Sequence, residues 1–86
     1  MQTKVLVLNE EGLHARPAGM LVKAASTFTS DIELEVDGDT ANAKSIMSIM
    51  GLGLTKNTEV TITANGADAE AAIKELTSLF NNKFNL

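Results

Sequence analysis

The chain has 86 residues, no cysteine and a formal net charge of -4 at pH 7. Hydrophobic residues make up 44% of it and charged residues 21%, which is typical of a folded globular domain. The acidic charge argues against a general nucleic-acid-binding protein, because such proteins carry a basic face. A single histidine without cysteine nearly excludes a structural zinc site, and the lack of thiols excludes disulfides. We expect no metal and no cofactor.

The first twelve residues lack the basic start and the long apolar run of a signal peptide. No apolar stretch approaches the roughly 20 residues that a membrane-spanning helix needs. We therefore expect a cytoplasmic protein without membrane insertion. The length predicts a single domain over residues 1–86, and we expect it to act as a monomer.

The first predicted elements are a strand and a helix. Residues 3–8 (TKVLVL) form a β-branched and leucine-rich run of strand length, which NEEG interrupts. After Pro17 the apolar positions recur at helical spacing: Ala18, Leu21, Val22, Ala25 and Phe28. Because proline is tolerated only in the first turn of a helix, this helix is predicted to begin beside Arg16 or Pro17.

The middle of the chain predicts a hairpin and a short helix. Residues 31–38 (DIELEVDG) alternate between apolar and acidic side chains, as in a half-buried strand of an antiparallel sheet. The turn signal DGDT leads into a short return strand, TANA (40–43). Residues 44–53 (KSIMSIMGLG) predict a short helix with Ser45 as its N-cap.

The last predicted elements are a strand and a helix. Residues 58–66 (TEVTITANG) alternate again, and Asp68 can cap the helix that follows. Its apolar stripe consists of Ala69, Ala72, Ile73, Leu76 and Phe80. Each element has one apolar face, so we expect an α+β fold of order βαββαβα. This is an open-faced β-sandwich, in which a four-stranded antiparallel sheet carries three helices on one face.

The segment GLHARPAG (12–19) holds the only histidine and the only proline of the chain. His14 falls at or just before a helix N-terminus, where unpaired backbone N–H groups and the helix dipole favour an anion. Arg16 adds a permanently charged fork that suits phosphate oxygens, and Gly12 permits a tight or close-approach conformation. A neutral imidazole is a nucleophile, so these groups predict a site where His14 accepts a phosphoryl group.

The residues alone leave other interpretations open. A lone histidine in a loop is often a surface residue without function, and the same spacing suits passive anion binding. A small hydrolase is disfavoured, because no second acid or base accompanies His14 beyond Glu10 and Glu11 of the preceding loop.

GLHARPAG resembles the active-site signature of HPr, the histidine-containing phosphocarrier family of the bacterial phosphoenolpyruvate:sugar phosphotransferase system. The segment AKSIMSIMGLG (43–53) is similar to a second part of the family, and the resemblance covers essentially the whole chain. It implies that phosphorylated enzyme I passes its phosphoryl group to Nδ1 of His14 and that sugar-permease A domains receive it. It also implies that Arg16 assists the phosphohistidine and that the backbone amides of Ala15 and Arg16 hold its oxygens. The protein would then be a carrier and not an enzyme in its own right.

Ser45 has two compatible interpretations. From the residues alone it is an N-cap, whose loss costs about 1 kcal/mol. The resemblance adds a regulatory role, because KSIM is similar to the serine that an ATP-dependent HPr serine kinase/phosphorylase modifies in low-GC Gram-positive bacteria. A phosphate there would hinder docking to an acidic partner, or create a surface for a catabolite-control transcription regulator. Lys44 either favours such a phosphate or is solvated.

Met47 and Met50 are candidates for a partner-binding patch. Methionine at helical spacing usually lies in a core, but Ile46 and Ile49 can supply the buried side of so short a helix. Flexible methionine suits a surface that binds several partners. The resemblance implies an apolar docking patch at this place, with Met47 the stronger candidate. Lys23 is a weaker candidate that could attract acidic partner surfaces.

One difference from the common Gram-positive pattern falls in this segment. There a glycine follows the first Ser-Ile-Met and a serine comes later, whereas Ser48 and Gly51 stand here in exchanged order. The exchange leaves Ser45 untouched but weakens the expectation of a secondary phosphorylation site. An alternative function is a regulatory interaction module controlled at Ser45, with little transport role. The presence of both His14 and Arg16 favours the carrier.

Overall fold

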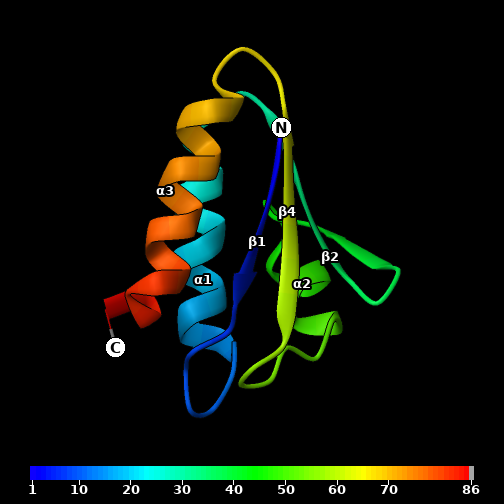
Figure 1. Cartoon of the computed structure of the whole chain (residues 1–86), viewed down its shortest axis with the longest axis vertical. Helices are drawn as coiled ribbons and strands as arrows, with labels where there is room; N and C mark the ends of the chain where they lie inside the picture. The colour runs from blue at the N-terminus through cyan, green and yellow to red at the C-terminus, as the bar shows by residue number, and fades with distance from the viewer. Residues whose placement is uncertain (86) are drawn as a thin grey trace.

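The structure is a computed structural model that describes residues 1–85. Its elements are β1 (Gln2–Leu6), α1 (Ala15–Ala25), β2 (Asp31–Val36), β3 (Asp39–Asn42), α2 (Ile46–Gly51), β4 (Glu59–Asn65), α3 (Ala69–Asn81) and a final helical turn, η1 (Lys83–Asn85). The strands form one antiparallel sheet in the order β1-β4-β2-β3. In Figure 1, α1 and α3 run side by side along the sheet. The predicted α+β fold, an open-faced β-sandwich of order βαββαβα, is confirmed.

The strands place alternate side chains in the core. Leu34 on β2 pairs with Ile62 on β4 and with Ala41 on β3, and all three are buried. Glu33 and Glu35 point the other way and are exposed. Because this outer face is polar, only one face of the sheet needs a covering layer.

The helices supply that layer. Buried side chains of α1, α2 and α3 join those of the strands in one hydrophobic core. The helical contribution comes from Ala18, Leu21, Ala25, Ile49, Ala72, Leu76 and Phe80. The apolar stripes predicted for the two longer helices therefore do cover the sheet.

Several element ends differ from the prediction. β2 stops at Val36 because Asp37 and Gly38 have positive φ angles of 52° and 89° and form the hairpin turn. α1 stops at Ala25, and Phe28 packs against the core from the turn that follows. The sequence analysis does not predict η1, whose residues all have positive φ angles.

Asp68 has a different role from the one predicted. It stands at the N-cap position of α3, but its side chain makes no capping hydrogen bond. Its carboxylate instead accepts hydrogen bonds from the backbone N–H groups of Thr29 and Ser30, both at 2.9 Å, and from the Ser30 hydroxyl. The Ser30 hydroxyl, followed by the backbone N–H of Thr29, lowers the pKa of Asp68 to about 2. Asp68 thus fastens the start of β2 to the start of α3.

Candidate functional site

His14 is the N-cap of α1. Its backbone is extended (φ -83°, ψ -165°), and its carbonyl accepts the first helical hydrogen bond, from Ala18 N at 3.0 Å. The helix begins at Ala15, one residue earlier than the earliest predicted start, so Pro17 is its third residue rather than its first. Proline has no N–H, so beyond the N-cap residue only Ala15 and Arg16 carry N–H groups without an acceptor inside the helix. Within residues 1–85 neither of these groups donates a hydrogen bond.

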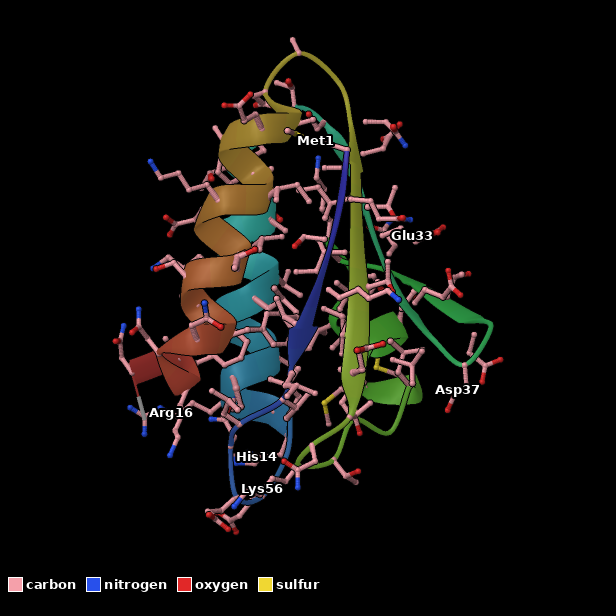
Figure 2. All side chains as sticks on the ribbon, viewed as in Figure 1. Met1, His14, Arg16, Glu33, Asp37 and Lys56 are labelled. Carbon is pink, nitrogen blue, oxygen red and sulfur yellow. The ribbon has the colours of Figure 1, made fainter. Side chains whose placement is uncertain are left out.

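The His14 side chain is exposed and makes no hydrogen bond to the end of the helix. Its backbone is fixed, however, because the neighbouring Leu13, Pro17 and Ala18 are all buried. Figure 2 shows His14 and Arg16 at the same end of the molecule, and the Arg16 side chain is also exposed. The arrangement places an accessible imidazole at the helix start that carries these two N–H groups, with the exposed Arg16 side chain at the same end of the molecule.

The loop that carries His14 rests on the loop after α2. Leu13 N donates a hydrogen bond to the carbonyl of Leu54 at 3.0 Å. Gly12 has a φ angle of +72°, and a Cβ there would collide with the Leu54 carbonyl oxygen and lie 3.0 Å from Thr55 Cα. The close backbone approach that Gly12 permits is therefore real, and only glycine fits it.

A salt bridge joins the same two loops at the surface. Lys56 Nζ lies 2.6 Å from Glu10 Oε1, and the side chains are 42% and 78% exposed. The hydrogen bond from Lys56, together with its charge, lowers the pKa of Glu10. The pair therefore ties the Glu10 carboxylate of the His14 loop to the loop after α2.

His14 lines an open pocket of about 230 Å³ together with Asn9, Glu10, Glu11 and Lys83. Asn9 is only 8% exposed, and its Nδ2 donates to the Lys83 carbonyl at 2.9 Å. Within the described chain, its Oδ1 has no hydrogen-bond partner. The sequence analysis missed Asn9 and Lys83, because no local pattern indicates that the end of the chain folds back to this loop.

Ser45 is the N-cap of α2, as predicted. Its Oγ accepts a hydrogen bond from Ser48 N at 3.3 Å, and its own carbonyl accepts one from Ile49 N at 3.1 Å. Lys44 is not simply solvated, since it is half-buried and its Nζ donates to the Phe28 carbonyl at 2.8 Å. This bond ties the residue before Ser45 to the segment after α1.

The exposed apolar side chains of α2 are Ile46 (40% exposed), Met47 (79%) and Met50 (42%), which we call the α2 patch. The prediction that Ile46 lies on the buried side is wrong. Ile49 is the one buried residue of α2, because a helix of six residues turns few side chains toward the core. Ile46 instead lies over α1, where its Cδ1 is 3.9 Å from the position of a Cβ on Gly19. The patch therefore borders the helix that His14 caps.

A family model described as "PTS HPr component phosphorylation site" matches residues 1–82. The chain belongs to the HPr family. HPr proteins are phosphocarriers of the phosphotransferase system, so the family assignment gives the class of function.

Solved HPr-type structures agree over almost the full length. HPr-C-His from Thermoanaerobacter tengcongensis is 44% identical with a TM-score of 0.97, covering 100% of this chain and 97% of that chain. The phosphocarrier protein HPr from Bacillus anthracis str. Ames is 45% identical with a TM-score of 0.89, covering 93% and 95%. The Bacillus subtilis catabolite repression containing protein Crh, in a domain-swapped dimer, is 44% identical with a TM-score of 0.79, covering 96% and 95%.

The HPr fold brings some predicted site residues together and separates others. His14, Ala15, Arg16 and Pro17 form one group at the N-terminus of α1, as their adjacency requires. Ser45 and the α2 patch form a second group on α2, which packs against α1. Lys23 lies apart from both groups, exposed in the last turn of α1, where a cation is favoured by the helix dipole.

Residues 1–85 contain neither a cluster of metal-ligating side chains nor a membrane-spanning helix. No three side chains of the types His, Cys, Asp and Glu gather there as metal ligands would. No helix in the same range has both the length and the apolar character needed to cross a membrane.

Proposed function

We propose that this HPr protein accepts a phosphoryl group from phosphorylated enzyme I on Nδ1 of His14 and passes it to sugar-permease A domains. The observation that carries the proposal is the exposed imidazole on the N-cap of α1, beside the N–H groups of Ala15 and Arg16, which donate no hydrogen bond within residues 1–85. The carrier acts in the cytoplasm as a monomer and uses no cofactor of its own.

The chemistry follows from this geometry. The lone pair of Nδ1 attacks phosphorus, and a P–N bond forms while the bond from phosphorus to its donor on enzyme I breaks. The phosphoryl group is conserved and no water is consumed. The N–H groups of Ala15 and Arg16 donate to its oxygens, and the Arg16 guanidinium adds a charge-assisted hydrogen bond. An exposed histidine suits a carrier, because two different proteins must reach the same nitrogen.

Phosphoryl transfer can be tested by mass. The protein is incubated with phosphoenolpyruvate, magnesium and a heterologous enzyme I, and its intact mass is measured before and after brief acid treatment. We expect one acid-labile phosphoryl group, and none on His14→Ala. Labelling of the His14→Ala protein would show that another residue accepts the group, and an unlabelled parent would remove the carrier function.

Regulation at Ser45 is the second part of the proposal. We propose that an ATP-dependent serine kinase phosphorylates the Ser45 hydroxyl and that the added charge changes docking at the adjacent α2 patch. A phosphate at the first turn of α2 is favoured by the free N–H groups of a helix start, so the fold tolerates it. Enzyme I, permease domains and a catabolite-control transcription regulator are the proposed partners of the α2 patch.

The similarity to Crh favours one alternative function, a regulatory module controlled at Ser45 with little transport role. The two functions predict phosphoryl groups of different acid stability on different residues. Transfer from enzyme I to His14 supports the carrier, whereas an acid-stable phosphate on Ser45 without any transfer to His14 supports the module.

A further inference from the structure

The end of the chain folds back onto the loop that carries His14. Lys83 lines the same pocket as His14, although almost the whole sequence separates them. The turn η1 to which Lys83 belongs contacts both α3 and α1. Lys83 therefore lies beside the N-terminus of α1, where the proposed phosphoryl group sits.

Two contacts fix the backbone of Lys83. The buried amide of Asn9 donates to its carbonyl at 2.9 Å. The next residue, Phe84, is fully buried and packs edge-to-face on Phe80, with 5.0 Å between the ring centroids. Lys83, Phe84 and Asn85 have φ angles of 51°, 56° and 60°. Three successive left-handed residues without glycine persist only where the surroundings hold them, so this position of Lys83 is built into the fold.

The charges around the pocket indicate what the Lys83 side chain could bind. The pocket is lined by two acidic residues, Glu10 and Glu11, whose negative charge would repel a phosphoryl dianion on His14. Lys56, which does not line the pocket, forms a salt bridge with the Glu10 carboxylate. Among the described residues that line the pocket, Lys83 is the one lysine or arginine. Its charge also reaches Glu10, because Lys83 adds to the effect of Lys56 in lowering the pKa of that carboxyl.

We propose that the Lys83 ammonium binds the phosphoryl group on His14 as a second cation beside Arg16, and that Asn9 is the positioning residue that holds Lys83 there. The inference rests on the proposed function and deepens it, because it adds residues to the phosphorylated state of the same site. Arg16 approaches the group from α1, whereas Lys83 approaches it from the pocket that Glu10 and Glu11 line.

The test uses chemically phosphorylated protein, so that it does not depend on enzyme I. Phosphoramidate transfers its phosphoryl group to the only histidine and releases ammonia. The pH midpoint of the phosphohistidine ³¹P resonance is then measured for the parent, Lys83→Gln, Lys83→Arg and Lys74→Gln. Lys74 is the matched control, since it is exposed in the middle of α3, outside the pocket, and its substitution changes the net charge equally.

We expect Lys83→Gln to raise the midpoint by about 0.2–0.7 pH units, since a neighbouring cation favours the dianion. Lys83→Arg keeps the cation and should stay near the parent, and the shift should shrink in 1 M salt. Asn9→Ala should raise the midpoint in the same direction by releasing Lys83. A midpoint for Lys83→Gln equal to that of the parent, or an equal shift in Lys74→Gln, would overturn the inference.

The outcome separates the two proposals. If enzyme I leaves His14 unlabelled while Lys83→Gln still shifts the chemical phosphohistidine, the carrier function fails and the Lys83 contact stands. If enzyme I labels His14 and Lys83→Gln matches the parent, the carrier stands and the Lys83 contact fails.

Discussion

His14 combines a fixed backbone with a free side chain. Buried residues on both sides hold its main chain, while its imidazole makes no capping bond and lies in solvent. At this scale the proposed site separates stability from chemistry, because the imidazole that we propose as the phosphoryl acceptor is not among the groups that hold the fold.

Replacement of His14 by alanine is therefore expected to remove phosphoryl acceptance but to change the free energy of unfolding by less than about 0.5 kcal/mol. The imidazole buries no surface in the core and caps no N–H group. Thermal unfolding of both proteins, followed by circular dichroism, checks the second half of the prediction. A large drop in the melting temperature would mean that His14 is a structural residue.

Gly12, unlike the His14 side chain, contributes to stability, because the fold requires its backbone conformation. We expect Gly12→Ala to destabilise the fold by about 1–3 kcal/mol, since a Cβ meets the Leu54 carbonyl and φ is positive. Gly51→Ala is the matched control, because nothing lies within 4 Å of a Cβ there and its φ is not in the left-handed region. Urea unfolding of both variants measures the difference, and equal midpoints would contradict this role of Gly12.

At the scale of elements, α2 depends on Ser45 in two ways that substitutions can separate. Ser45→Ala should cost about 1 kcal/mol of stability, because the bond to Ser48 N is lost. Ser45→Asp retains a good N-cap and adds a charge, so it should keep the stability of the parent yet accept phosphate from enzyme I more slowly. Chemical denaturation and single-turnover transfer give the two readouts. Equal transfer rates for Ser45→Asp and the parent would contradict regulation by charge.

The Asp68 clamp connects two elements and should make stability depend on acidity. The Ser30 hydroxyl and the N–H of Thr29 favour the charged carboxylate and lower its pKa from 3.8 to about 2. Its contribution is therefore fully present above pH 4 and is lost as the pH falls from about 4 to about 2.

Asp68→Asn is expected to be less stable than the parent at pH 7, with a difference that shrinks over this acid range. Melting temperatures between pH 2 and pH 7 provide the measurement. Asp39→Asn is the control, because the Asp39 side chain accepts no hydrogen bond in the described part of the chain. A pH-independent difference between parent and Asp68→Asn would contradict the clamp.

At the scale of the whole molecule, the sequence predicts what depends on local periodicity. The alternation in β2 and β4 and the spacing in α1 and α3 determine one buried face for each element, and the sheet follows from them. His14 and Arg16 also stay close in any fold, because only one residue separates them in the sequence. The fold and the centre of the site could therefore be predicted.

The features that were missed depend on contacts between distant segments. Asp68 is a good N-cap by residue type, but the N–H groups of Thr29 and Ser30 compete for its carboxylate once the elements pack. The pairing of Asn9 with Lys83 has no periodic signature, because it needs a left-handed turn that nonglycine residues rarely form. Sequence patterns identify the buried face of each helix and strand. The hydrogen-bond partners of Asp68 and Asn9 are determined only once the elements pack together.

The N-terminal amine lies far from His14. Its nitrogen donates to the Ala64 carbonyl at 2.9 Å, and Figure 2 shows Met1 and His14 at opposite ends of the long axis. Immobilising the protein on a sensor chip through its amino end would thus orient every copy with the imidazole toward the flowing partner. Tethering near Lys83 would crowd the pocket that His14 lines, so the choice of attachment point decides whether a binding assay can detect docking.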